Sequence, residues 1–149
     1  MNIRFDENGY IKPYRPIELD LKEFQQIFAY NVHRQQLFDT YLGYLDMLQN
    51  MGIGKFTQWI NGSYVTQFAY PRDIDLVNFV NYDFHRKFEQ RLKGMKNDLK
   101  QQGIDAYFET AYPETHQRHF LTVFQQNKWR EIYGTDRKDI KKGFIQINY

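Results

Sequence analysis

The chain has 149 residues, a length that suits one domain with a sizeable buried core. Hydrophobic residues make up 42% of the sequence and charged residues 26%, which excludes a disordered chain. The absence of cysteine excludes disulfides, thiolate catalysis and cysteine-based zinc sites, and the net charge of +2 is too small to indicate a surface built for nucleic acid. With no apolar run near the roughly 20 residues of a membrane span and no signal-peptide segment, we expect a cytoplasmic protein that does not contact membranes.

The N-terminal segment, residues 1–18, is predicted to be an extended arm. Pro13 and Pro16 oppose a long helix there, because proline removes a backbone donor and fixes φ. Asp20 is then placed to cap a short helix that runs through Tyr30, since an aspartate side chain accepts from the free N–H groups of a first helical turn. The arm should therefore lead directly into the first helix.

Three further helices follow from apolar residues that recur at intervals of three and four positions. The first covers residues 33–51 and stops before Gly52. The second and most regular covers residues 84–99 and is closed by Gly103. Residues 115–130 are predicted to form the third.

Short apolar segments between the helices predict the strands. They cover residues 56–60, 74–80, 104–112 and 144–147. The segment 74–80 is almost continuously apolar, which is typical of a central strand buried on both faces. Residues 63–68 are predicted to form only a short helical turn. We therefore expect a single α/β domain over residues 1–149, more strictly α+β, in which helices pack against a small mixed sheet.

Two carboxylates at the start of the predicted central strand are the strongest sign of chemistry. Asp73 and Asp75 are two residues apart, so alternation along a strand would project both side chains from the same face. Converging carboxylates are what divalent cations need when they clamp the attacking and leaving oxygens of a phosphoryl or nucleotidyl transfer. Upstream, Gly62 allows a phosphate to approach the backbone closely, and Ser63 offers a hydroxyl at the start of a helical turn. Each short pattern alone commonly marks a solvated turn, but together they are moderately specific.

This combination resembles the signature of the DNA polymerase β-like nucleotidyltransferase superfamily, in which Gly-Ser precedes an Asp-x-Asp flanked by apolar residues. The segment WINGSYVTQFAYPRDIDLV, followed later by IDAYF and KGFIQI, is similar to a family of small uncharacterised bacterial nucleotidyltransferase-like proteins of the minimal type. The resemblance implies a nucleotidyltransferase-like fold in which Asp73 and Asp75 coordinate Mg²⁺ or Mn²⁺. It also implies that Gly62 and Ser63 lie against the β and γ phosphates of a nucleoside triphosphate.

The superfamily usually carries a third carboxylate on a later strand, and the sequence offers two candidates. Asp105 is our choice because apolar residues bracket it at the start of a predicted strand, and Glu109 is its rival on the same strand face. By resemblance, Asp105 would complete a metal site and help to deprotonate the acceptor hydroxyl. Arg72 is a candidate phosphate contact. The basic run at residues 137–142 is interpreted as a solvated connection rather than a phosphate-binding patch.

The leading hypothesis is a metal-dependent nucleotidyltransferase that moves NMP from an NTP to a hydroxyl on protein or RNA. The resemblance further suggests one half of a bacterial toxin–antitoxin or phage-defence pair, with a cognate toxin or antitoxin protein as partner. The first alternative is a catalytically inactive module of the same fold that binds a nucleotide or a protein. The second is a metal-dependent nuclease that uses the same carboxylates. The high aromatic content of 18% is compatible with a homodimer.

Overall fold

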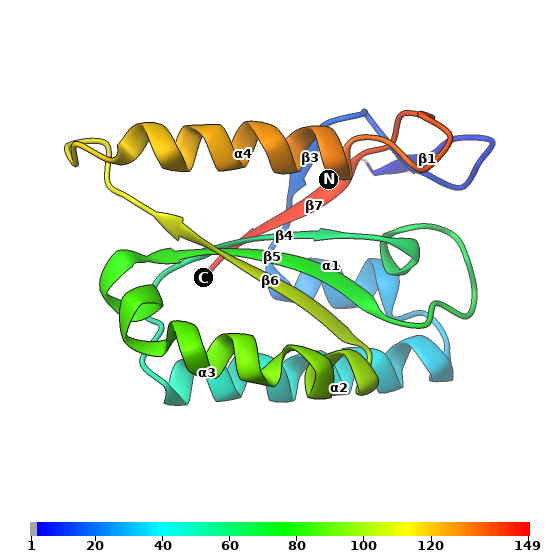
Figure 1. The fold of residues 1–149 in the computed structure, drawn as a ribbon. Helices are drawn as coiled ribbons and strands as arrows, with labels where there is room; N and C mark the ends of the chain where they lie inside the picture. Colours follow the sequence, from blue (N-terminus) through cyan, green and yellow to red (C-terminus); the bar gives the residue numbers. More distant parts are fainter. Residues whose placement is uncertain (1–2) are drawn as a thin grey trace.

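A mixed sheet of five strands, in the order β3-β7-β4-β5-β6, forms the centre of the computed structural model, which describes residues 3–149 (Figure 1). The strands are β3 (Pro16–Glu18), β4 (Thr57–Asn61), β5 (Ile74–Asn81), β6 (Ile104–Ala111) and β7 (Phe144–Asn148). Strand β4 runs antiparallel to both β5 and β7, whereas β5 pairs in parallel with β6 and β3 pairs in parallel with β7. The parallel pair β5 and β6 requires a crossover connection, which a helix supplies.

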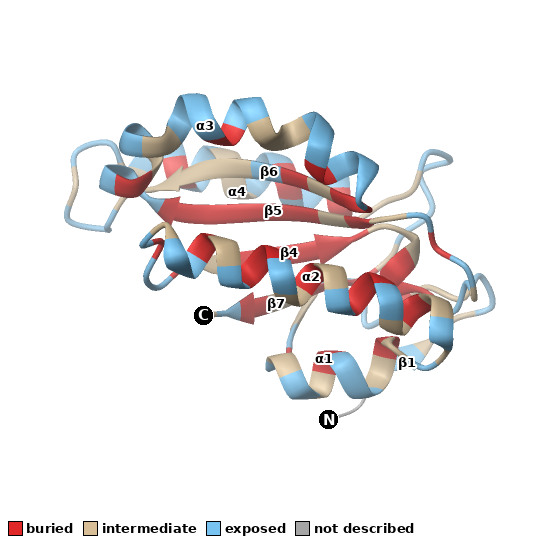
Figure 2. Ribbon diagram, turned by 90° about the horizontal axis from the view of Figure 1, so that it is seen from below, coloured by how far each residue is buried: buried red, intermediate tan, exposed pale blue. Residues whose placement is uncertain are grey.

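Helices cover the two faces of the sheet unequally. They are α1 (Leu21–Phe28), α2 (Val32–Asn50), α3 (Tyr82–Gln101) and α4 (His119–Tyr133). Helices α1, α2 and α3 lie on one face, and α4 lies across the other (Figure 1). Buried positions concentrate on β4, β5 and β7 and on the helix sides that face them (Figure 2). The larger core therefore lies between the sheet and α1, α2 and α3, while a smaller apolar cluster lies under α4.

The predicted α+β class is confirmed, and most predicted elements lie close to their expected bounds. Strands β4, β5, β6 and β7 match the four predicted strands to within one residue at each end. Between β4 and β5, the predicted helical turn is shorter than expected and consists of the 3₁₀ helix η1 (Ser63–Val65). Within the described residues, none of the helices has the length and apolar character needed to cross a membrane.

The first helix begins at the predicted cap. The Oδ1 atom of Asp20 accepts from the backbone N–H of Glu23 at 2.7 Å, and Glu23 Oε2 accepts from the backbone N–H of Asp20 at 2.9 Å. This reciprocal capping box satisfies two backbone donors at once and fixes where α1 starts. The helix ends at Phe28, two residues before the predicted end at Tyr30.

The fourth helix starts later than predicted. Residues 115–118 form turns and a bend, and α4 runs from His119 to Tyr133 instead of from 115 to 130. The backbone N–H of His116 donates to the carbonyl oxygen of Pro113 at 2.9 Å, so this segment closes tight turns before the helix begins. At the other end the helix continues because Trp129 and Tyr133 pack in the cluster beneath it.

Short strands also occur in the N-terminal arm, of which the structure describes residues 3–18. Strands β1 (Arg4–Phe5) and β2 (Ile11–Lys12) form a two-stranded antiparallel sheet. Strand β3 then pairs with β7 and covers that side of the main sheet. Pairing at this edge protects backbone groups of β7 that would otherwise form an open strand edge.

Candidate functional site

Three polar residues lie side by side on neighbouring strands. In the register of β4, β5 and β6, Asn61 pairs with Asp75, and Asp75 pairs with Asp105. Paired residues on neighbouring strands project from the same face of a sheet. Two positions along, that face carries Trp59 and Val77, which pack in the cluster under α4. Asn61, Asp75 and Asp105 therefore form a polar row on the α4 face of the sheet.

A central cavity of about 810 Å³ lies over this polar row. Besides the polar row, the residues that line this cavity come from three parts of the chain. They are Tyr107 and Glu109 of the sheet, Lys128, Trp129 and Tyr133 of α4, and Asp136, Arg137 and Lys142 of the segment after α4. Acidic groups thus come mainly from the sheet, and basic groups come from α4 and the segment that follows it. A cavity with this division suits a ligand that carries both a metal ion and phosphate groups.

Gly62 brings the first half of the sequence motif into contact with the second half. Its φ of +81° is left-handed, and a β-carbon built on it would lie 2.4 Å from the Oδ2 atom of Asp75. Only glycine fits such a close approach without displacing the carboxylate. Ser63 follows at the start of η1 and also lines the central cavity. Because η1 has only a single turn, it has no substantial helix dipole, so the Ser63 hydroxyl is the side-chain group that this turn can offer to a ligand.

Asp75 carries a strongly perturbed carboxyl group. Burial raises the pKa of Asp75 to about 7, and the carboxylates of Asp73 and Asp105 and a hydrogen bond with Asp73 act in the same direction. The ammonium group of Lys142 acts in the opposite direction but does not offset the rise. A buried carboxyl group crowded by other carboxylates is stabilised by a cation, and such groups are typical of functional sites.

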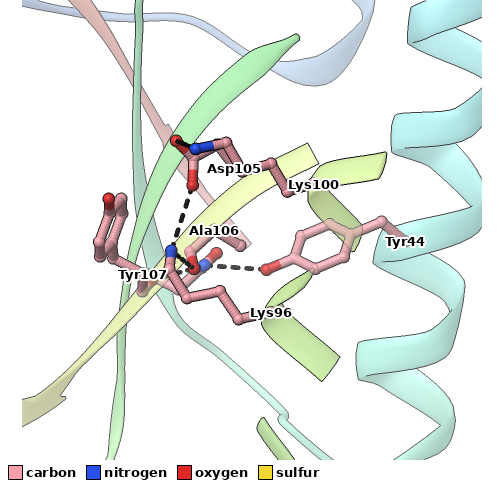
Figure 3. Close-up of polar contacts among 7 residues, drawn as sticks. Tyr44, Lys96, Lys100, Asp105, Ala106 and Tyr107 are labelled. Atoms are coloured by element: carbon pink, nitrogen blue, oxygen red, sulfur yellow. Dashed lines mark hydrogen bonds and ion pairs between the residues drawn. The ribbon is translucent and has the colours of Figure 1, made fainter. Parts of the chain in front are cut away.

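Asp105 lies beside Asp75, but both of its carboxylate oxygens face lysine side chains from α3 (Figure 3). Lys96 Nζ is 3.1 Å from Asp105 Oδ1, and Lys100 Nζ is 4.0 Å from Asp105 Oδ2. Across residues 3–149, no group of three or more His, Cys, Asp or Glu side chains is arranged to hold a metal ion. The polar row therefore contains one carboxylate, Asp105, that is paired with ammonium groups and one, Asp75, that forms no ion pair among the described residues.

The two candidates for a third carboxylate occupy different positions relative to Asp75 in the strand register. Asp105 lies opposite Asp75, whereas Glu109 lies opposite Phe79, further along β6. Glu109 Oε1 instead accepts from the indole N–H of Trp129 at 3.2 Å, which ties β6 to α4. Asp105 is thus the candidate that lies next to the Asp73–Asp75 pair.

Arg72 and Asp73 lie at the edge of the site rather than inside the central cavity. Both line a second cavity of about 500 Å³ near the start of β5, together with Lys100. The carboxylate of Asp73 still raises the pKa of Asp75, which lines the central cavity. The exposed Arg72 is not among the residues that line the central cavity, so a ligand there would meet Ser63 and the basic groups after α4 instead.

Residues 3–148 match a family that is described as a family of unknown function, DUF6932. The chain belongs to the DUF6932 family. Neither a curated protein nor a solved structure matches this DUF6932 chain. The family assignment carries no activity with it, so the function of the DUF6932 protein has to be argued from the site itself.

Two residues of the site in this DUF6932 protein were missed from the sequence. Asn61 and Tyr133 are only 6% and 4% exposed, and both line the central cavity. Among the described residues, Asn61 Oδ1 and the Tyr133 hydroxyl have no hydrogen-bond partner, although buried polar atoms are almost always paired. The asparagine directly before Gly62 was a signal in the sequence. Tyr133 gave no such signal in the sequence. It lies four residues after Trp129, which is also the spacing of two side chains that simply pack on one face of a helix.

A third missed residue of the DUF6932 protein is Lys142. The basic run 137–142 was interpreted as a solvated connection, and this was wrong for its last member, which is partly buried and lines the central cavity. Burial lowers the pKa of Lys142, while the carboxylates of Asp75 and Asp136 act in the opposite direction. Lys142 therefore brings a positive charge close to the polar row.

Proposed function

We propose that this protein is a metal-dependent nucleotidyltransferase, which transfers NMP from a nucleoside triphosphate to a hydroxyl group on protein or RNA. The observation that carries the proposal is the contact between Gly62 and Asp75. It joins the Gly-Ser turn to Asp75 of the Asp-x-Asp pair, which lies elsewhere in the sequence, on the lining of the central cavity. A nucleotidyltransferase of the DNA polymerase β-like type needs this juxtaposition of a phosphate-binding turn with carboxylates.

The residues present fit a Mg²⁺ or Mn²⁺ ion. Carboxylate and amide oxygens are the ligands that these hard cations prefer. Asp73 and Asp75 supply two carboxylates that interact electrostatically, and Asn61 supplies a buried amide oxygen that lacks a partner among residues 3–149. These three side chains would hold the ion. When bound, the cation would neutralise phosphate oxygens and lower the barrier to displacement at phosphorus.

The central cavity also suits a nucleoside triphosphate. Its volume of about 810 Å³ lies within the range of small-molecule sites. Lys128, Arg137 and Lys142 provide positive charge for the phosphates, and the Ser63 hydroxyl lies on the same lining. Tyr107 adds aromatic surface to the same lining.

In the proposed reaction, the acceptor oxygen attacks the α phosphorus and forms a new P–O bond. The bond between the α phosphorus and the oxygen that bridges it to the β phosphorus breaks, and pyrophosphate leaves. The hydroxyl proton passes to the carboxylate of Asp105, which lies next to the metal-binding residues in the polar row. Lys142 and Arg137 are placed to stabilise the charge on the pyrophosphate.

A second candidate function is favoured by the pairing of Asp105 with Lys96 and Lys100. A carboxylate neutralised in this way is a weaker proton acceptor, which supports an inactive module that binds a nucleotide without transferring it. Both functions use the central cavity, and they differ in whether the bond to the α phosphorus is broken. A cognate toxin or antitoxin partner remains part of the leading proposal through the sequence resemblance.

Label transfer tests the proposal directly. The purified protein is incubated with each α-³²P-labelled nucleoside triphosphate, Mg²⁺ or Mn²⁺ and a bacterial lysate, and acid-insoluble label is treated with protease or nuclease to identify the acceptor class. We expect transfer by the wild type and by Asp46→Asn, an exposed aspartate on α2, and none by Asp75→Asn. Full transfer by Asp75→Asn would contradict the assignment. Nucleotide binding without transfer under any condition would favour the inactive module.

A further inference from the structure

We propose that the ammonium group of Lys96 takes the place of a second metal ion at Asp105, so that the site works with one divalent cation. This inference rests on the proposed function and concerns how the same site is charged. Two-metal transfer sites place one cation near the attacking oxygen and one near the leaving group. Asp105 is the side chain that would help to hold the cation near the attacking oxygen. It is already paired with the ammonium group of Lys96 (Figure 3).

Lys96 is held by contacts with three consecutive residues of β6. Its Nζ donates to Asp105 Oδ1 at 3.1 Å and to the backbone carbonyl oxygen of Ala106 at 3.2 Å. The same atom lies 3.4 Å from the ring centroid of Tyr107, within the range of a cation–π contact. Because β6 is an edge strand, a side chain from α3 can reach around it to the α4 face. These contacts fix the ammonium group at the polar row.

The shielding of this ion pair distinguishes it from an ordinary surface pair. The side chain of Asp105 is 15% exposed and that of Lys96 is 38% exposed, whereas Lys93 and Glu89 form a pair of the same 3.1 Å length with exposures of 68% and 48%. Pairs in open solvent contribute little because water and salt screen them. The Lys96–Asp105 pair is screened less, so a metal ion would have to displace a well-held ammonium group at Asp105.

Asp73 and Asp75, unlike Asp105, have no ammonium or guanidinium partner among the described residues. Across residues 3–149, neither forms an ion pair with lysine or arginine within 4.0 Å, and the carboxylate of Asp73 is close enough to raise the pKa of Asp75. Asn61, which lines the cavity and pairs with Asp75 between β4 and β5, has a buried amide oxygen that lacks a partner among the described residues. The two carboxyl groups of the Asp-x-Asp pair therefore lack an ion-pair partner within the described part of the chain, and this is where one divalent ion would bind. At Asp105, Lys96 would stabilise the developing charge on the attacking oxygen as a built-in cation.

Counting bound Mn²⁺ tests this inference without an activity readout. The full-length protein is titrated with Mn²⁺ alone and then with Mn²⁺ and an α,β-methylene ATP analogue, and bound Mn²⁺ is counted by electron paramagnetic resonance after subtracting the Mn²⁺ held by the free analogue. We expect one protein-bound Mn²⁺ in the wild type. Asp105→Asn should leave this ion in place with less than about a threefold change in affinity, whereas Asp75→Asn should remove it.

Removal of the ammonium group should open the second position. Lys96→Met keeps the apolar stem of the side chain and removes the ammonium group. We expect this variant protein to bind a second Mn²⁺ at Asp105, or to bind the first Mn²⁺ about tenfold more tightly because a nearby positive charge is gone. Lys96→Gln, which retains a donor for Ala106, gives the same comparison if the methionine variant is poorly folded by circular dichroism. Lys93→Met, one turn earlier on α3, removes an equally short ion pair away from the site and should match the wild type.

The outcomes separate this inference from the proposed function. Two Mn²⁺ ions in the wild type, reduced to one by Asp105→Asn, would overturn the role of Lys96 while supporting a two-metal nucleotidyltransferase. A Lys96→Met protein with unchanged Mn²⁺ number and affinity would also overturn it. No Mn²⁺ bound to the wild type under either condition would contradict the metal-dependent function itself.

Discussion

Two reciprocal hydrogen bonds join Arg34 and Tyr64. Arg34 Nη1 donates to the backbone carbonyl oxygen of Tyr64 at 2.6 Å, and the Tyr64 hydroxyl donates to the backbone carbonyl oxygen of Arg34 at 2.9 Å. The guanidinium also lies 4.9 Å from the centroid of the Tyr64 ring. This pair joins α2 to the segment that begins with the Gly62-Ser63 turn, so the larger core and the candidate site share one anchor.

The first prediction concerns this anchor. Arg34 is fully buried and donates to backbone carbonyl oxygens of Phe28, Ser63, Tyr64, Thr66 and Phe68. Arg34→Met would leave these acceptors without their donor, and we expect the free energy of unfolding to fall by roughly 3 to 5 kcal/mol in urea denaturation. Arg86→Met, on the exposed face of α3, should change it by less than about 0.5 kcal/mol. Similar losses for the two variants would contradict the anchoring role.

The second prediction concerns the contact between Gly62 and Asp75. Gly62→Ala places a methyl group 2.4 Å from Asp75 Oδ2 at a φ of +81°, and we expect a loss of about 2 to 3 kcal/mol in the free energy of unfolding. Combining it with Asp75→Ala should recover the steric part, about 1 kcal/mol, in a double-mutant cycle. The control is Gly43→Ala in the middle of α2, where nothing lies within 4 Å of the added carbon and a gain of about 0.5 to 1 kcal/mol is expected. Strict additivity in the cycle would argue against direct contact.

The third prediction concerns the pH dependence of stability in the metal-free protein. Because burial and nearby carboxylates raise the pKa of Asp75 from 3.8 to about 7, the folded state holds a proton between these values that the unfolded state has already lost. Stability therefore falls as the pH rises through this window. The shift corresponds to about 4 kcal/mol in full, and solvent screening of this partly exposed side chain reduces the expected effect to about 2 kcal/mol. Asp75→Asn removes the effect, so the stability gained by this substitution relative to the wild type should be about 2 kcal/mol larger at pH 8 than at pH 4.

Urea denaturation in EDTA at the two pH values measures this difference. Asp46→Asn is the control, because Asp46 is exposed on α2 away from the polar row, and its stability difference from the wild type should be the same at both pH values. A difference for Asp75→Asn that shrinks from pH 4 to pH 8 would show that the folded state does not raise this pKa.

Local sequence signals were sufficient for most of the fold. The cap at Asp20 and the apolar run of β5 depend on neighbouring residues, so their positions follow from short-range chemistry. Strand β3 is different, because its three residues pair with β7 at the far end of the chain. No periodic pattern can be read from three residues, and a pairing over such a distance depends on the assembled sheet.

The candidate site was predictable where the chemistry is local in sequence and not where it is assembled in space. The spacing of Asp73 and Asp75 and the glycine before Ser63 can be read directly. The position of Asp105 beside Asp75 depends on the register of a parallel pair joined by a whole helix. The reach of Lys96 around the edge strand depends on how α3 packs against β6, so the sequence alone could not show that Asp105 is already paired.

The fourth prediction uses the unpaired hydroxyl of Tyr133. In the nucleotide-free protein this buried group has no hydrogen-bond partner among residues 3–149, so Tyr133→Phe should leave the free energy of unfolding unchanged or raise it by up to about 1 kcal/mol. Tyr41→Phe is the matched comparison, because the Tyr41 hydroxyl donates to Gln58 Oε1 and lies 2.6 Å from the Tyr149 hydroxyl. Its loss should cost about 1 to 2 kcal/mol.

Nucleotide binding should depend on Tyr133 and not on Tyr41, which is the opposite of their expected effects on stability. Tyr133 lines the cavity that holds the polar row, so a nucleotide bound there would give its buried hydroxyl the partner it lacks. We expect Tyr133→Phe to weaken binding of the α,β-methylene ATP analogue about tenfold in calorimetry, and Tyr41→Phe, on the α1–α3 side of the sheet, to bind it like the wild type. The opposite result would be a Tyr133→Phe protein that loses stability as Tyr41→Phe does and binds the analogue normally. The Tyr133 hydroxyl would then be a structural group with a water partner, and it would no longer support a ligand in the cavity.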